Sequence, residues 1–119
     1  MIALSAMRDS FRKISISAGV LIWRSRAIYE LYLRKLNELG LPPISFIGHG
    51  IGLHLHEDPY LGPTDDQPLE AGMVLGIEPL VYETGFGFGM QNKDMVLVTG
   101  SGCELLSDYA NTDKLLIVA

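Results

Sequence analysis

Three histidines, two carboxylates and three glycines fall within twelve consecutive residues, the stretch GHGIGLHLHEDP from Gly48 to Pro59. Imidazole and carboxylate groups commonly bind transition metals and transfer protons near neutral pH. On an extended strand His54 and His56 would share one face and could hold one zinc or iron ion. A jelly-roll metal barrel would also need a glutamate four or five residues later. Tyr60 and Leu61 stand there, so this interpretation fails.

The second interpretation of this stretch assigns the chemistry to His49 and His56 and leaves His54 outside the site. Glycines at every second position around His49 allow unusual backbone angles and a close approach of substrate or of another chain segment. Ordinary structural roles for all three histidines are the alternative. The alternating glycines favour a functional site.

Glu78 is a further candidate, because it is the single carboxylate in the apolar stretch GMVLGIEPLVY. A carboxylate within a buried strand needs a cation, a metal or hydrogen bonds to offset its desolvation. Pro79 follows it, and we expect this proline to end or bulge the strand. A buried ion pair with a purely structural role stays open as an alternative.

One helix is expected, with Ser25 as its cap and RAIYELYLRKLNEL as its body. Its apolar stripe consists of Ile28, Leu31, Tyr32, Leu36 and Leu39. This spacing is typical of an amphipathic helix. Gly40 supplies a left-handed exit, and the two prolines at 42 and 43 prevent continuation.

Strands and loops are expected elsewhere. SISAGVLIW (15–23) is a strand, or a loop followed by a short strand, and ISFIG (44–48) is a strand. DPYLGPTDDQPLEAG (58–72) is a loop, and MVLGIEPLVYE (73–83) is a buried strand. GFGFGMQN and KDMVLVT form a further ribbon, which GSG turns into CELLS. One helix followed by an antiparallel sheet predicts an α+β fold.

The composition limits the classes of partner. The 119 residues suffice for one domain or less. Hydrophobic residues make up 48% and charged residues 19%, which indicates surface to be covered by more of the same chain or by another subunit. An unusually apolar small domain is the alternative. The net charge of −5 argues against nucleic acid as a partner.

The expected location is the cytoplasm. The single cysteine, Cys103, cannot form an internal disulfide and fits a reducing compartment, where we expect it to be structural. No apolar run approaches the roughly 18 residues that a membrane span requires. The N-terminal MIALSAMRDSFRKI has no basic segment ahead of its apolar part, so no secretory signal is expected.

Three motifs in order carry a family resemblance: GHGIGLHLHEDP, LEAGMVLGIEPLVY and KDMVLVTGSGCELLS. They resemble the C-terminal part of the pita-bread (M24-type) metallopeptidases, which include Xaa-Pro dipeptidases, aminopeptidase P and methionine aminopeptidases. The segment YELYLRKLNELGLPPISFIGHGIG resembles the family's helix before its first histidine motif. The resemblance implies a partial pita-bread fold, a curved antiparallel sheet with one main flanking helix. It also implies that residues 1–119 are a single, truncated fragment of the catalytic domain.

The resemblance also implies site roles. The family's centre holds two divalent ions (Mn, Co, Zn or Fe) with two aspartates, one histidine and two glutamates. By position, His49 resembles the metal-binding histidine, and His56 resembles the histidine that hydrogen-bonds substrate and intermediate. Glu78 resembles the first metal-binding glutamate, near the attacking water. Paired ions produce hydroxide at neutral pH, and a carboxylate can transfer its proton.

Lys93 is the main departure from the family pattern, because it stands where the family has its second glutamate, with Met95 in place of a threonine. A charged ammonium cannot be a metal ligand. It would repel a second cation, or substitute for one, and it could bind a substrate carboxylate. Asp94 is no replacement, because adjacent strand residues face opposite sides.

The two metal-binding aspartates are also missing. Asp9 is the only aspartate before His49. Of five expected ligands the chain therefore offers two, His49 and Glu78, which leaves open that it holds no metal.

Three functions stay open. The chain could be a fragment of an Xaa-Pro peptidase, inert or weak by itself. It could be a metal-independent hydrolase like creatinase, with His49 as general acid and base on a small C–N substrate, Glu78 and His56 orienting it, and Lys93 neutralising a carboxylate. It could be a non-catalytic binding module. A peptide or small amide is the expected substrate, and the apolar surface is compatible with a homodimer.

Overall fold

The structure, a computed structural model, describes residues 23–82, 85, 87–91 and 93–107. Most of the predicted element at 15–23, and Asp9, lie outside these residues. The described elements are α2 (Ser25–Glu38), β1 (Gly48–Ile51), β2 (Glu57–Leu61), β3 (Val74–Ile77), β4 (Leu80–Val81), β5 (Met90–Gln91), β6 (Asp94–Thr99) and β7 (Gly102–Leu105).

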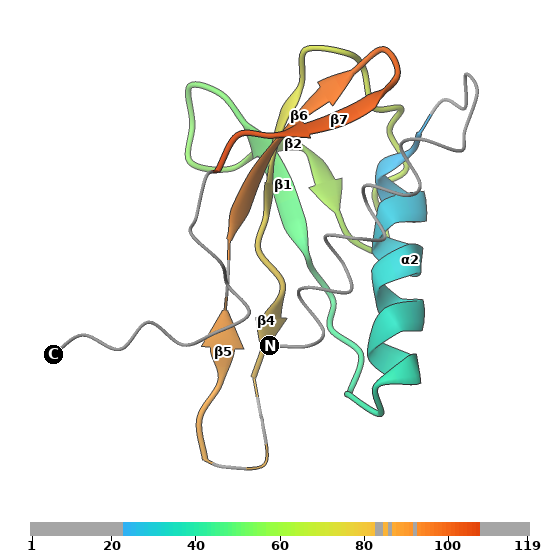
Figure 1. The fold of residues 1–119 in the computed structure, drawn as a ribbon, viewed down its shortest axis with the longest axis vertical. Helices are drawn as coiled ribbons and strands as arrows, with labels where there is room; N and C mark the ends of the chain where they lie inside the picture. The colour runs from blue at the N-terminus through green and yellow to red at the C-terminus, as the bar shows by residue number, and fades with distance from the viewer. Residues whose placement is uncertain (1–22, 83–84, 86, 92, 108–119) are drawn as a thin grey trace, which may run out of the picture.

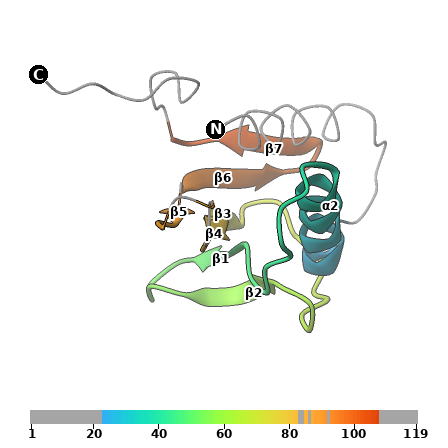
Figure 2. The same ribbon diagram turned by 90° about the horizontal axis from the view of Figure 1, so that it is seen from below.

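Five strands form an antiparallel sheet in the order β2-β1-β3-β6-β7, and α2 packs against one of its faces (Figures 1 and 2). A separate two-stranded ribbon, β4-β5, extends from the ends of β3 and β6 (Figure 1). The predicted α+β arrangement of one helix and an antiparallel sheet is confirmed.

The helix buries the face that its apolar stripe predicted. Ile28, Tyr32 and Leu36 are buried against the sheet, together with Tyr29, whose hydroxyl donates to the carbonyl oxygen of Ile44 at 2.7 Å. Burial raises the pKa of Tyr32 to about 12, because the charged phenolate would lose its hydration. The predicted place of Leu39 in the stripe is wrong. It follows the last helical residue and is 43% exposed.

The N-terminus of the helix differs from the prediction. Arg24 is the cap residue, and it makes no side-chain cap hydrogen bond. Ser25 is instead the first helical residue and is fully buried. Its hydroxyl accepts from the Gln67 backbone N–H at 3.0 Å, and its own N–H donates to the Gln67 carbonyl oxygen at 2.9 Å. The hydroxyl therefore ties the helix to the loop after β2. The C-terminal prediction is confirmed, since Gly40 has a φ of 67°.

β2 corrects the prediction of a loop from residue 58 onward. Glu57–Leu61 pairs with β1, and the register shifts between His49 and Gly50. Pro59 is tolerated because β2 is an edge strand with neighbours on one side only. The strand predicted at 44–48 is wrong for residues 44–47, which lie in no strand. Regular pairing begins at Gly48, and β1 continues into the histidine stretch as far as Ile51.

The long strand predicted over 73–83 is split at Glu78 and Pro79, into β3 and β4. The predicted effect of Pro79 is thereby confirmed, since proline has no N–H for the ladder. The predicted hairpin of KDMVLVT and CELLS is also confirmed as β6 and β7, with Thr99 paired to Gly102. The predicted ribbon of GFGFGMQN with KDMVLVT is wrong, because β5 pairs with β4 and β6 pairs with β3 and β7.

The glycines around His49 permit close backbone contacts, as predicted. A methyl group on Gly48 would overlap the carbonyl oxygen of Gly76 on β3, and one on Gly50 would overlap the carbonyl oxygen of Asp58. The unusual backbone angles predicted there are not found, because neither these two glycines nor Gly52 has a positive φ.

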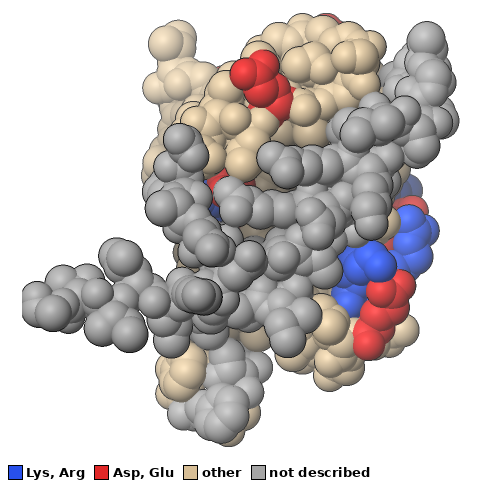
Figure 3. All heavy atoms as spheres, in the orientation of Figure 1, with Lys and Arg blue, Asp and Glu red and all other residues tan. Residues whose placement is uncertain are grey.

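Charged side chains of both signs adjoin over α2 in Figure 3, and the helix carries an ion pair between Lys35 and Glu38 at 2.7 Å. Within the described part of the chain, no helix combines the length and apolarity required to cross a membrane.

Replacing Gly48 by alanine is expected to lower the free energy of unfolding by about 2–3 kcal/mol, because the added methyl must displace the backbone of β3. Urea denaturation measures this loss. Gly100→Ala is the matched control, since nothing lies within 4 Å of its added methyl. Equal effects of the two substitutions would contradict the close packing of β1 on β3.

Leu61→Ala is expected to destabilise the fold by about 2–5 kcal/mol, because Leu61 is fully buried beneath α2. Leu53→Ala removes the same atoms from a side chain that is 99% exposed, and is expected to change stability by no more than about 0.5 kcal/mol. Thermal or urea unfolding of both variants compares them directly. Similar losses would show that the core lies elsewhere.

Candidate active site

Strand register brings the predicted site residues to one face of the sheet, opposite to α2. His49 on β1 pairs with Gly76 on β3, and Ile77 pairs with Asp94 on β6. Extending this antiparallel register by one residue places Glu78 opposite Lys93. Because alternate strand residues share a face, Glu78 lies on the same side as Gly76 and therefore as His49.

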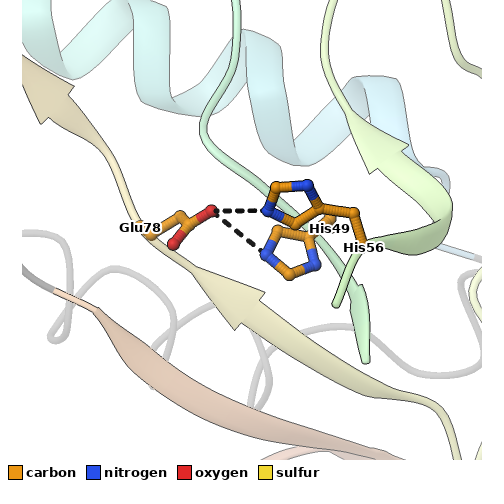
Figure 4. A group of neighbouring side chains, drawn as sticks. All are labelled: His49, His56 and Glu78. Carbon is orange, nitrogen blue, oxygen red and sulfur yellow. Dashed lines mark ion pairs between the residues drawn. The ribbon is translucent and has the colours of Figure 1, made fainter. Parts of the chain in front are cut away.

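Glu78 is the centre of a group that we name the Glu78 cluster, formed with His49, His56 and Lys93. Its Oε1 lies 3.1 Å from His49 Nε2 and 3.8 Å from His56 Nε2 (Figure 4). Its Oε2 lies 3.1 Å from Lys93 Nζ, which is also 3.4 Å from His49 Nε2. The imidazole of His49, the carboxylate of Glu78 and the ammonium of Lys93 therefore meet in one cluster. The roles assigned to them stay predictions.

The four side chains differ in their exposure to water. His49 is fully buried and Glu78 retains 12% of its side-chain exposure, whereas His56 and Lys93 retain 46% and 39%. The cluster is therefore accessible from the side of His56 and Lys93, and His49 is at its closed end. A ligand would meet His56 and Lys93 first.

A hydrogen bond fixes how His49 can act. Its Nδ1 lies 2.7 Å from the carbonyl oxygen of Gly50, which only accepts, so Nδ1 carries a proton. In the neutral ring Nε2 is then an acceptor and can take a hydrogen bond from Lys93. In the charged ring Nε2 donates to Glu78. Nε2 is thus the atom at which His49 can exchange a proton.

Aromatic contacts orient both histidine rings. Phe46 stacks on His49 with centroids 6.1 Å apart, and the rings of His49 and His56 meet edge to face at 4.1 Å. Phe46 also contacts Tyr60, at 6.2 Å. The sequence analysis missed Phe46, and no local signal identifies it. It lies three residues before His49 and outside the regular strand, so strand alternation does not predict the contact.

His54 lies outside the Glu78 cluster, as the second interpretation of the histidine stretch predicted. It is in the exposed loop between β1 and β2, where its ring Nδ1 is 3.2 Å from Glu57 Oε1. The backbone N–H of His54 also donates to this oxygen at 2.7 Å. That hydrogen bond lowers the pKa of the Glu57 carboxyl by stabilising its charged form. His54 and Glu57 are therefore partners in the loop.

The cluster does not fit a two-ion metal centre. His49, His56 and Glu78 each offer one donor atom, and the three atoms lie within 4.8 Å of one another. Three such donors could hold one ion, but two ions need more ligands. Lys93 adds a positive charge 3.1 Å from Glu78 and donates no lone pair. Within the residues that the structure describes, no carboxylate other than that of Glu78 belongs to this group of donors.

Comparison with known proteins finds similar sequences and similar structures. An uncharacterized peptidase of Staphylococcus aureus is 44% identical over 63 residues, which cover 53% of this chain and 18% of the relative. An Xaa-Pro dipeptidase of Pyrococcus furiosus is 41% identical over 64 residues, covering 54% and 18%. The chain thus spans less than a fifth of the length of these curated relatives.

Solved structures extend the likeness over most of the fold. An X-Pro aminopeptidase of Thermotoga maritima matches with a TM-score of 0.74 and 29% identity, covering 92% of this chain and 30% of that protein. Prolidase from Pyrococcus furiosus matches with a TM-score of 0.71 and 28% identity, covering 89% and 32%. The described fold is therefore part of a pita-bread fold. Residues 2–100 match the profile of metallopeptidase family M24, so the chain belongs to this family.

Proposed function

We propose that this chain is the C-terminal part of a hydrolase that cleaves Xaa-Pro peptide bonds. The observation that supports this best is the Glu78 cluster, in which a buried imidazole and a carboxylate adjoin a more exposed histidine. In this proposal His56 hydrogen-bonds the substrate carbonyl, and Glu78 transfers a proton. The names of two similar proteins, an Xaa-Pro dipeptidase and an X-Pro aminopeptidase, support the substrate class.

The same proposal makes the isolated chain inert or weakly active. It offers two of the five expected metal ligands, and Lys93 replaces a third. The remaining ligands would come from the preceding part of a longer polypeptide.

A cytoplasmic location and a homodimer belong to this proposal. A single cysteine among 119 residues supports the location. The exposed Leu53 and Leu55, at 99% and 80%, support a covering subunit.

A second function is favoured by one observation, the contact of Lys93 with Glu78. We propose as the alternative a metal-independent hydrolase of a small C–N substrate. His49 Nε2 would take a proton from water as the resulting hydroxide adds to the substrate carbon. The same proton would pass to the leaving nitrogen as the C–N bond breaks, which releases an amine. Lys93 would pair with a substrate carboxylate.

For the first function, the isolated chain with excess Mn²⁺ or Co²⁺ is expected to release proline from an Xaa-Pro dipeptide no faster than its Glu78→Gln variant. Proline release measured by chromatography checks this. Turnover by the parent chain at the 1–10³ s⁻¹ of ordinary enzymes would contradict the missing-ligand argument.

Sequencing the gene upstream of codon 1 tests the proposal that the chain is a fragment of a longer protein. The expected result is an in-frame extension with two aspartates on a predicted strand pair, and an in-frame stop codon would refute it.

For the alternative, hydrolysis of a creatine-like amide should persist in the presence of a chelator, and His49→Asn should lower kcat by about 10²–10⁴-fold, because Asn cannot take the proton. Steady-state kinetics with EDTA measures both. His54→Asn is the matched control and should retain full activity, since His54 lies outside the cluster. Loss of activity with EDTA, or equal effects of the two substitutions, would exclude this function.

A further inference from the structure

We propose that the ammonium group of Lys93 is the resident cation of the Glu78 cluster and that it prevents His49, His56 and Glu78 from holding a divalent metal ion. The inference concerns the occupancy of the cluster in this chain by itself. It agrees with the metal-independent alternative function, and under the first function the Lys93 side chain would have to move before a metal ion could bind to His49 and Glu78. It identifies Lys93 as a built-in substitute for a metal ion.

The position of the ammonium group is the first argument. Nζ lies within hydrogen-bonding distance of Glu78 Oε2, at 3.1 Å, and 3.4 Å from His49 Nε2. These two residues supply two of the three donor atoms that could hold an ion. The charge of Lys93 therefore lies against the groups whose lone pairs a metal would need.

The second argument is that Lys93 and a metal ion cannot be far apart. An ion bonded to His49 Nε2 at about 2.1 Å would lie no more than about 5.5 Å from Nζ, because Nζ is itself 3.4 Å from Nε2. At such a distance, in a cluster where Glu78 is mostly buried, repulsion between a divalent ion and an ammonium is only partly screened. Bound metal would have to displace the Lys93 side chain.

The path of the Lys93 stem is the third argument. A methyl group on Gly76 would approach Lys93 Cε to 3.0 Å and Nζ to 3.3 Å. The stem thus crosses β3 above the one residue there that has no side chain. Gly76 is also the partner of His49 in the sheet. The space left by this glycine directs the ammonium toward His49 and Glu78, so its position follows from the fold.

Co²⁺ titration tests the inference, because the visible absorption of Co²⁺ reports its ligands without any enzymatic reaction. The parent chain is expected to show no Co²⁺ site that depends on His49. Lys93→Met keeps an unbranched stem and removes the charge. It should bind Co²⁺ at least about tenfold more tightly. Adding His49→Asn to this variant should remove the gain.

Two controls separate the position of the charge from its mere presence. Lys35→Met removes the ammonium of the Lys35–Glu38 ion pair on α2, with the same change in net charge, and should bind Co²⁺ as the parent does. Lys93→Arg keeps a cation in the cluster and should also behave as the parent. Far-UV circular dichroism checks folding, and Lys93→Gln replaces Lys93→Met if the latter unfolds.

Three outcomes would overturn the proposal. The parent chain could bind Co²⁺ through His49 as tightly as Lys93→Met does. The neutral variants could fail to gain affinity. Lys93→Arg could gain as much as Lys93→Met, which would show that the charge is irrelevant. Each result is read from the same titration.

Discussion

The pairing of the Glu78 carboxylate with His49 and Lys93 is the interaction on which this site depends. Its side chain is 12% exposed, and a carboxylate so far removed from water requires compensating charge or hydrogen bonds. Both neighbouring strands contribute, since His49 comes from β1 and Lys93 immediately precedes β6. The cluster therefore exists only while three strands keep their register. A slip of one residue would turn Glu78 toward α2 and the apolar core.

Much of the fold could be predicted from sequence because its local signals agree. The apolar stripe of the helix, Gly40 at its end and Pro79 after Glu78 act through short-range geometry, which a sequence displays directly. The failures involve distant partners. Ser25 has the residue type of a cap, but its hydroxyl is bound by Gln67, 42 residues away. Residues 58–61 contain a proline and were predicted as loop, but they belong to β2, which pairs with the edge of β1.

The candidate site was predictable to a different degree for each residue. Glu78 was identifiable because a carboxylate among apolar residues needs a partner, and His49 because glycines surround it. Those patterns name no partners, and the pairing of Glu78 with Lys93 rests on register. The β4-β5 ribbon lies between residues 78 and 93, and the sequence does not show where this ribbon turns, so it does not show which residue faces Glu78. Phe46 could not be predicted, because it lies in an irregular segment and its stacking on His49 produces no periodic pattern in the sequence.

The break at Pro79 couples two parts of the molecule mechanically. Glu78 and Pro79 connect β3 to the β4-β5 ribbon, and the carbonyl oxygen of Glu78 accepts from the Gln91 side chain of that ribbon at 3.2 Å. The backbone N–H of Glu78 donates to the carbonyl oxygen of Ile47, the residue before β1. The backbone of Glu78 is thus hydrogen-bonded both to the residue before β1 and to the β4-β5 ribbon. A partner that bound to the β4-β5 ribbon and moved it would therefore also move the backbone that carries the Glu78 carboxylate.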